Sequence, residues 1–314
     1  FIGGHLARRL CAEGHEVTAL VRTPSKADAL VALGVTLLHG DLSLFARPDC
    51  VLPPADVVIH LAGVVTASDP AQYEAINFTA VVDLMDCLER QDWMPRRLLF
   101  ASSLAAAGPS PADHPWTEAD PLSPIDPYGE AKARAEGALA AASFPVTCFR
   151  PPVVLGPGDP AFLTIFKAAK GRVGIRVAGE PQRLSWVYID DLIAAILAMA
   201  EDTGTENATY FTTSEETVDI RRLWSALSAA LDRRILVLPI PGPILAGVSA
   251  VAVALSGIFG FTNQLDDKQV AQMRASAFVC TSARLTADLG WRAQVGFEDA
   301  VTRTARGYTE MGWL

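Results

Sequence analysis

Short runs of apolar and β-branched residues alternate with helical periodicity from residue 15 to about residue 155. The runs predict five strands, at residues 16–21, 35–39, 56–61, 97–102 and 146–150. Continuous apolar stretches, such as Val57 to Ile59 and Leu98 to Phe100, are typical of strands covered on both faces. Strands that alternate with helices indicate right-handed crossovers, so we predict a doubly wound α/β fold with a parallel sheet.

The pattern becomes less regular after Gly156-Pro157-Gly158, which indicates a smaller second domain. A helix near residues 190–199 is expected to return to the sheet, with Asp190 and Asp191 as its cap. The two domains would therefore interleave. We predict a first domain at 1–155 plus about 184–212, and a second, C-terminal domain at about 156–183 plus 213–314.

One long stretch, from residue 235 to residue 265, contains no charged residue, and residues 244–261 within it are almost wholly apolar. A membrane-spanning helix needs roughly 20 such residues, so this length is borderline. The large residues fall on one helical stripe, with small residues opposite. The stretch is interpreted as a buried helix or a lid over an apolar pocket, as a peripheral membrane contact, or as a membrane span.

Composition narrows the class of protein. The 314 residues, half of them hydrophobic, can bury a large core. A formal net charge of -9, with thinly spread Lys and Arg, argues against a nucleic-acid partner. The five cysteines are far apart and never in C-x-x-C spacing, so they indicate neither a disulfide framework nor a zinc site. No metal ligand set is visible, and a reducing cytoplasm fits this usage best.

The chain opens with Phe1-Ile2-Gly3-Gly4-His5-Leu6, which resembles the last glycine of a G-x-x-G-x-x-G phosphate loop and the start of its helix. Such a helix offers free backbone N–H groups and its positive dipole end to a dinucleotide pyrophosphate. We expect the full-length protein to carry roughly ten more residues, a strand plus T-G-x-x-G. Without that strand, two neighbouring strands would keep unpaired backbone groups, and the fragment would fold badly or bind cofactor poorly.

Tyr128 and Lys132 occur four residues apart in Asp126-Pro127-Tyr128-Gly129-Glu130-Ala131-Lys132. Asp126 as N-cap and Pro127 as first helical residue would place Tyr128 in the first turn and Lys132 on the same face. At about 5 Å and an effective dielectric of about 20, Coulomb's law gives roughly 3 kcal/mol, or about two pKa units. We therefore expect the ammonium to lower the pKa of Tyr128 toward neutrality, where a general acid or base works best.

Ser103 directly follows the predicted strand 97–102 and precedes Tyr128, so both hydroxyls can converge on one carbonyl oxygen. The structural alternative is that Ser103 only forms a local turn. His60 ends another apolar strand and is expected to be a packed core histidine rather than a base.

These motifs, taken in order, resemble the extended short-chain dehydrogenase/reductase family, in particular its epimerase/dehydratase and 3β-hydroxysteroid-dehydrogenase-like branches. The resemblance covers residues 1 to about 200 and is loose beyond them. It implies a Rossmann-type sheet for the first domain and a substrate-binding role for the second. The motifs that carry it are residues 1–6, Gly40-Asp41-Leu42, His60-Leu61-Ala62-Gly63, Asn77 to Ala80, Ser102-Ser103, Tyr128 to Lys132 and Arg150-Pro151-Pro152-Val153.

The resemblance implies a role for four catalytic positions. Tyr128 would be the acid/base, and Lys132 would bind the nicotinamide ribose and lower the tyrosine pKa. Ser103 would hydrogen-bond the substrate oxygen. Asn77 would brace the wall of the active site and a proton-relay water.

The resemblance also implies a cofactor site. Gly3 alone would represent the glycine loop, Asp41 and Leu42 would meet the adenine, Leu61, Ala62 and Gly63 would lie on the adenosine side, and Pro151 to Val153 would meet the nicotinamide carboxamide. NAD-preferring relatives place an acidic residue after the second strand, where this chain has Arg22. Arg22, with Lys26 nearby, could hold a 2′-phosphate, so we predict NADP over NAD. The alternative is that Arg22 is an ordinary solvated residue.

The predicted function is an NAD(P)-dependent oxidoreductase that interconverts a secondary alcohol and a ketone or aldehyde. An apolar sterol-, isoprenoid- or flavonoid-like substrate is favoured, because Leu104 and its neighbours offer little to sugar hydroxyls. A nucleotide-sugar epimerase is the alternative, and a non-catalytic NADP-binding regulator is a third. The family resemblance is compatible with a homodimer.

Overall fold

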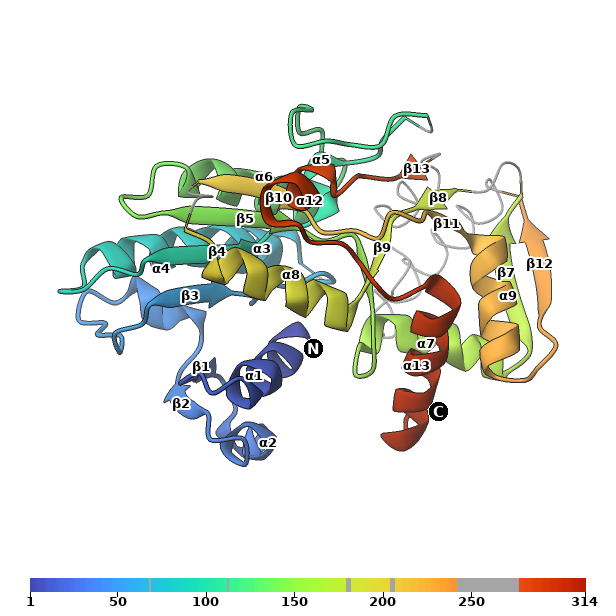
Figure 1. Ribbon diagram of the computed structural model, residues 1–314, viewed down its shortest axis with the longest axis horizontal. Helices are drawn as coiled ribbons and strands as arrows, with labels where there is room; N and C mark the ends of the chain where they lie inside the picture. The colour runs from blue at the N-terminus through green and yellow to red at the C-terminus, as the bar shows by residue number, and fades with distance from the viewer. Residues whose placement is uncertain (68, 112, 179–181, 204–206, 242–276) are drawn as a thin grey trace.

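The computed structural model describes residues 1–67, 69–111, 113–178, 182–203, 207–241 and 277–314 (Figure 1). The apolar stretch 244–261 lies outside the described residues. Within the described residues, no helix is both long enough and apolar enough to cross a membrane.

The N-terminal half follows the predicted alternation of strands and helices. All five predicted strands are present, and their bounds differ by at most two residues from those expected. The elements of this half, in chain order, are α1 (Ile2–Ala12), β1 (Thr18–Val21), η1 (Pro24–Lys26), α2 (Asp28–Val31), β2 (Thr36–His39), η2 (Leu42–Ala46), β3 (Val57–His60), α3 (Pro70–Glu74), η3 (Ala75–Thr79), α4 (Ala80–Glu89), β4 (Arg97–Ala101), α5 (Leu104–Ala107), α6 (Pro127–Leu139) and β5 (Val146–Arg150).

The C-terminal half has shorter strands and several helices. Its described elements are β6 (Val153–Leu155), α7 (Pro160–Lys170), β7 (Val173–Val177), β8 (Arg183–Leu184), β9 (Trp186–Tyr188), α8 (Ile189–Glu201), β10 (Ala208–Phe211), β11 (Val218–Asp219), α9 (Ile220–Ala230), β12 (Leu236–Ile240), β13 (Ala277–Phe278), α12 (Ala283–Leu289) and α13 (Phe297–Glu310).

The main sheet has four parallel strands in the order β10-β5-β4-β3. Strands β1 and β2 form a separate parallel pair. Among the described residues, no ladder joins β1 to β3, so each of these two strands has one edge without strand pairing. This α/β architecture with a parallel sheet is the fold that the sequence predicts.

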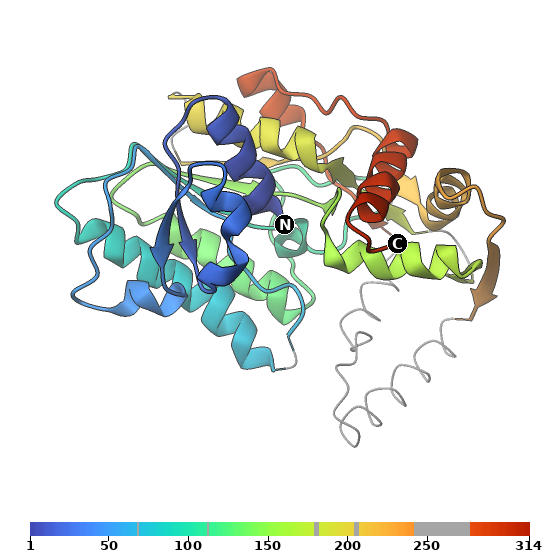
Figure 2. The ribbon, with the colours of Figure 1, turned by 90° about the horizontal axis from the view of Figure 1, so that it is seen from below.

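Helices cover both faces of the main sheet, as Figure 2 shows from below. On β4, Leu99 and Ala101 pack in one core with α8 and with Leu6 of α1. Leu98 and Phe100 point the other way, into a second core with α4 and α6. Because successive strand residues face opposite sides, a strand buried on both faces is apolar along most of its length, as β4 is from Leu98 to Ala101.

The chain returns to the sheet after residue 183, because α8 packs on β4 and β10 pairs with β5.

The expectation that Asp190 and Asp191 cap α8 is wrong in detail. The N-cap position of α8 is Tyr188, which makes no side-chain cap. Asp191 instead accepts hydrogen bonds from the backbone N–H groups of Gln294 and Val295, at 3.1 and 3.0 Å, and so ties the segment before α13 to α8.

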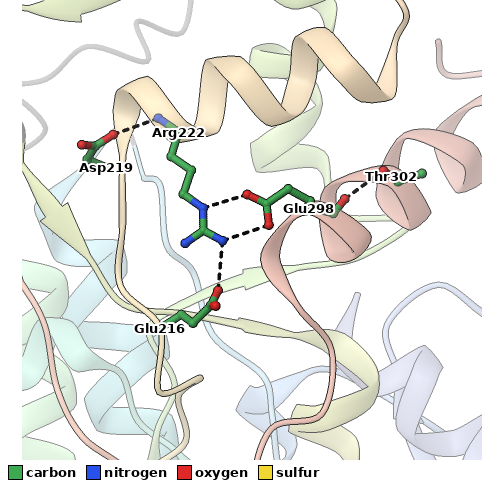
Figure 3. A network of polar contacts seen from close by, with 5 residues as sticks. All are labelled: Glu216, Asp219, Arg222, Glu298 and Thr302. Atoms are coloured by element: carbon green, nitrogen blue, oxygen red, sulfur yellow. Dashed lines mark hydrogen bonds and ion pairs between the residues drawn. The ribbon is translucent and has the colours of Figure 1, made fainter.

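An exposed polar network joins α9 to α13 (Figure 3). The guanidinium of Arg222 donates two hydrogen bonds to Glu298 and one to Glu216. The Asp219 carboxylate caps α9 by accepting from the backbone N–H of Arg222 at 2.8 Å. The two carboxylates raise the pKa of Arg222, so the guanidinium stays charged at any physiological pH.

Candidate active site

Strand β4 delivers Ser103 to the carboxyl edge of the main sheet, where ligands bind in open α/β folds. Ser103 is the N-cap of the short helix α5, and its Oγ accepts a hydrogen bond from the backbone N–H of Ala105 at 3.1 Å. The same hydroxyl also hydrogen-bonds the side chain of Tyr128. The local cap and the contact with Tyr128 therefore coexist.

Helix α6 begins as predicted. Asp126 is the N-cap, Pro127 is the first helical residue, and the Asp126 carboxylate accepts from the backbone N–H of Gly129 at 2.8 Å. Gly129 allows α6 to approach α5 closely, because a Cβ there would lie 2.3 Å from the carbonyl oxygen of Ala105. This close packing brings Tyr128 to Ser103.

The pKa of Tyr128 differs from the expectation. Burial raises it to about 12, and the hydrogen bond from Ser103 offsets only part of that rise. The ring lies 6.4 Å from the ring of Tyr73, and Tyr128 keeps part of its surface exposed. The predicted fall toward neutrality is therefore wrong for this structure, because desolvation of the phenolate outweighs the hydrogen bond of Ser103, and Asp126 and Tyr73 raise the pKa further. Tyr128 is a neutral phenol at physiological pH.

Lys132 is buried and lies four residues after Tyr128 on the same helix. Its Nζ donates a hydrogen bond to the carbonyl oxygen of Ala101 at 2.7 Å and lies 4.7 Å from the centroid of the Phe100 ring. Burial lowers the pKa of Lys132 to about 8, against the charge of Glu136, which raises it. The ammonium is thus anchored to the end of β4.

Asn77 and Gly63 bring the segment after β3 against Lys132. Asn77 is fully buried in the π-helical turn η3, and its side chain makes two hydrogen bonds to the backbone of Val64, at 2.9 and 3.0 Å. A Cβ at Gly63 would lie 2.9 Å from Asn77 Oδ1 and 3.3 Å from Lys132 Nζ. The absence of a side chain at Gly63 keeps the surface beside the ammonium open.

His60 is a buried core residue, as predicted. Its ring stacks on Phe100 with 6.0 Å between centroids, and its Nε2 has no hydrogen-bond partner within the part of the chain described. Burial, with a smaller contribution from the charge of Lys132, lowers the pKa of His60 to about 3. The imidazole is therefore neutral at physiological pH.

Most positions expected to bind cofactor follow the carboxyl ends of strands. Gly3 at the start of α1 lies beside Leu61, since a Cβ on Gly3 would be 3.8 Å from Leu61 Cδ1. Ala62 and Gly63 continue that segment. Pro151 lies next to Ser103, because its carbonyl oxygen accepts from the backbone N–H of Leu104 at 3.0 Å. Val153 begins β6.

Arg22 and Asp41 follow the ends of strands β1 and β2. The Asp41 carboxylate accepts from the backbone N–H and the hydroxyl of Ser43, at 2.9 and 2.6 Å, and caps η2, which begins at Leu42. These hydrogen bonds and the nearby charge of Arg22 lower the pKa of Asp41. Arg22 is exposed and thus available to an anion. The side chain of Lys26 lies outside the description.

The geometry fits a nicotinamide dinucleotide. The N-terminus of α1 beside Leu61 can face phosphate groups. The exposed backbone of Gly63 lies next to the Lys132 ammonium, where a ribose hydroxyl could meet that charge.

Sequence reasoning missed two groups at this site. Tyr73 is buried near Tyr128, and its hydroxyl accepts from the backbone N–H of Ala67 at 2.9 Å. Glu136 forms a buried ion pair with Arg150, with 2.6 Å between Oε2 and Nη2. The spacing of Tyr128, Lys132 and Glu136 by four residues could have indicated Glu136, but no sequence signal indicated Tyr73.

Comparisons with known proteins agree with this geometry. A ceramide reductase of Caulobacter vibrioides is 25% identical over 323 residues, covering 100% of this chain and 93% of the relative. A decarboxylating sterol-4-alpha-carboxylate 3-dehydrogenase of Saccharomyces cerevisiae is 24% identical, covering 80% of this chain and 76% of the relative. A solved UDP-glucose 4-epimerase of Thermus thermophilus in complex with NAD shares the fold, with a TM-score of 0.77, 22% identity and coverage of 98% and 96%.

These coverages give no support to the expectation that an N-terminal strand and glycine loop are missing. Residues 1–210 match the model of one family, described as the NAD dependent epimerase/dehydratase family. That match takes in the Ser103, Tyr128 and Lys132 constellation and the strand ends around it, which identifies the protein as an NAD(P)-dependent enzyme. The chain therefore belongs to the NAD dependent epimerase/dehydratase family, a branch of the extended short-chain dehydrogenases/reductases.

Proposed function

We propose that this enzyme is an NADP-preferring oxidoreductase that interconverts a secondary alcohol and a ketone on an apolar substrate. The observation that carries the proposal is the convergence of Ser103, Tyr128 and Lys132 at the carboxyl end of β4. A nicotinamide cofactor, when bound, supplies the hydride chemistry.

Each residue has a distinct task. Tyr128, with a pKa raised to about 12, is a phenol at neutral pH and can donate its proton to the oxygen of a ketone. Ser103 steadies that oxygen by a hydrogen bond. Lys132 holds a positive charge where the phenolate forms, and it can contact the cofactor ribose through the open surface at Gly63. Asn77 keeps that surface in place by binding Val64.

The neighbourhood of Ser103 favours an apolar substrate. Leu104 and Ala105 follow it directly, and the exposed Val65 follows the Gly63 segment. Two relatives that align with most of this chain are named for lipid substrates, a ceramide and a sterol. The substrate-binding part would comprise about 156–183 and 213–314, as the sequence predicts.

The alternative is a nucleotide-sugar epimerase. It is favoured by the likeness in fold to the Thermus thermophilus UDP-glucose 4-epimerase. An epimerase returns the hydride to its substrate and shows no net turnover of free cofactor, whereas the proposed reductase consumes NADPH. Loss of NADPH absorbance with a panel of apolar ketones would support the reductase. Conversion of UDP-glucose without loss of NADPH absorbance would support the epimerase.

The catalytic assignment is tested by Tyr128→Phe. Loss of a positioned proton donor is expected to lower kcat about 10²- to 10⁴-fold. Tyr308→Phe is the matched control, because Tyr308 is also a buried tyrosine but donates to the carbonyl oxygen of Asp159, away from Ser103. Unchanged turnover in Tyr128→Phe would remove Tyr128 from the mechanism.

Ser103 needs a second variant, because it also caps α5. Ser103→Ala should lower kcat about 10²-fold or more, and Ser103→Thr should keep both the cap and most of the activity.

Cofactor preference is tested by Arg22→Ala, which should raise the KM for NADPH about tenfold or more through loss of a charge-assisted hydrogen bond. The KM for NADH should stay nearly constant, and a wild-type preference for NADH would refute the assignment.

A further inference from the structure

Five cations that are separated in the sequence gather at one end of the molecule. Lys167 and Lys170 lie in the last turn of α7, Arg172 precedes β7, and Arg233 and Arg234 precede β12. The guanidinium of Arg233 donates to the carbonyl oxygen of Lys170 at 3.3 Å, and the backbone N–H of Leu236 donates to the carbonyl oxygen of Arg172 at 3.0 Å. These bonds join the α7–β7 turn to the α9–β12 turn. We call these five residues the basic tip.

The basic tip is exposed, and none of its five side chains forms an ion pair with a described residue. Asp232 is the acidic residue of the same turn. Elsewhere the described surface arginines commonly pair with carboxylates, as Arg222 does with Glu298. On a chain with a net charge of -9, this concentration of positive charge at one end indicates an anionic partner.

An exposed apolar face begins beside the basic tip. Strands β7 and β12 form a parallel pair in which Val173 lies opposite Leu236 and Ile175 opposite Leu238. One face of this pair packs on α9, because a Cβ at Gly174 would lie 2.8 Å from the Trp224 ring. Side chains alternate along a strand, so the four residues point to the other face. They are 47%, 42%, 64% and 44% exposed, in the order Val173, Ile175, Leu236 and Leu238.

We propose that the basic tip and the exposed face of β7 and β12 dock the protein on an anionic lipid bilayer. This surface lies at the end of the molecule opposite β2 and β3, where α7, α9, β7 and β12 meet (Figures 1 and 2). The proposal does not depend on the substrate proposed above, because it concerns where the protein lies and not what it converts.

Charge complementarity argues for a bilayer as the occupant. A peripheral membrane surface combines large apolar side chains, which enter the boundary between headgroups and acyl chains, with Lys and Arg beside them, which contact anionic headgroups. A protein partner would not need five clustered cations around a purely aliphatic face. A nucleic acid would use the cations and leave the four aliphatic residues in water.

A hollow next to the basic tip offers room for headgroups. It has a volume of about 620 Å³ and runs along α9, and its lining includes Arg221, Arg233, Arg234 and Ser225. Guanidinium groups around such a hollow can bind a phosphate by paired hydrogen bonds. The hollow lies on the α9 side of the strand pair, since Trp224 and Val237 also line it.

The test is sedimentation of the full chain with vesicles. We expect vesicles of phosphatidylcholine mixed with phosphatidylglycerol to bind the protein, and vesicles of phosphatidylcholine alone to bind it weakly. Each cation near an anionic surface strengthens binding about fivefold, so Arg172→Glu/Arg234→Glu should weaken it at least about 25-fold. Raising the salt to about 1 M should release the wild type, because the screening length falls to about 3 Å.

Two control pairs separate this surface from general effects. Arg8→Glu/Arg306→Glu makes the same change of net charge on exposed residues of α1 and α13 and should bind like the wild type. Leu236→Ser/Leu238→Ser should weaken binding, whereas Val51→Ser/Met94→Ser, which changes two other exposed apolar residues, should not. All variants keep residues 242–276 unchanged, and their thermal unfolding midpoints confirm folding.

Four results would overturn the proposal. They are equal binding to both kinds of vesicle, equal loss of binding in tip and control pairs, binding to a DNA duplex in place of vesicles, and dissociation of an oligomer by Leu236→Ser/Leu238→Ser with vesicle binding unchanged.

Discussion

The buried His60 should make the protein sensitive to acid, and this prediction can be worked out quantitatively. The pKa of His60 is about 3 in the folded chain, against 6.5 for an ordinary histidine. As pH falls below 6.5, the unfolded chain therefore binds a proton that the folded chain refuses. The stabilisation is fully present above pH 6.5 and is lost progressively as pH falls toward 3.

The magnitude follows from the two pKa values. Between about pH 7.5 and about pH 5, the linkage relation gives a loss of about 2 kcal/mol of unfolding free energy from His60 alone. The figure hardly depends on the folded-state pKa, because any value well below 5 leaves the folded histidine neutral across this interval. Against a total stability of about 5–15 kcal/mol, such a change is readily measured.

The assay compares urea unfolding of the wild type and His60→Leu at both pH values. Carboxylates contribute equally to both proteins, so they cancel in the double difference, which should be about 2 kcal/mol. His15→Leu, at an exposed histidine, is the control and should leave the double difference near zero. A value below about 0.5 kcal/mol for His60→Leu would refute the assignment of His60 as the acid-sensitive group.

Three other changes have defined outcomes. In thermal unfolding, Gly129→Ala should destabilise the protein by about 2 kcal/mol or more, because its Cβ would meet the Ala105 carbonyl oxygen at 2.3 Å. Gly137→Ala is the control at an open position of the same helix, and it should be neutral or stabilise the protein by up to about 1 kcal/mol. Glu136→Gln should cost about 3–5 kcal/mol because it leaves the buried Arg150 without its partner; Glu74→Gln, in the exposed pair with Arg134, should cost less than about 1 kcal/mol. The kcat/KM for ketone reduction should be flat below about pH 8 and fall above it, because Lys132 loses its proton there; a profile that stays flat to pH 10 would show that the ammonium is not required.

The sheet could be predicted from the sequence because its signal is local. A strand such as Leu98 to Phe100 is apolar on both faces, and only a covered strand needs that. The cap of α6 was equally local, since Asp126 and Pro127 are adjacent to the helix that they begin. The approach of Ser103 to Tyr128 was expected from the position of Ser103 after a predicted strand, and the family resemblance gave the two residues their roles.

The electrostatics of the site could not be predicted in the same way. Spacing in the sequence gives the separation of Tyr128 and Lys132 but not their burial, and here burial decides the direction of both pKa shifts. The basic tip shows the same limit. Its five cations come from two turns that are distant along the chain, so neither stretch of sequence looks strongly basic by itself. Only the pairing of β7 with β12 brings the two turns together.

The direction in which the Asn77 side chain points depends on the number of residues in the π-helical turn Ala75–Thr79. One additional residue in a helical turn offsets the side chains that follow it by about 100° relative to those before it. Removing a single residue there would give a more regular and locally more stable helix from Pro70 to Glu89, but it would rotate Asn77 away from Val64. Insertions and deletions in this helix therefore differ in kind from substitutions, because the phase of the helix sets whether the Asn77 side chain reaches the backbone of Val64.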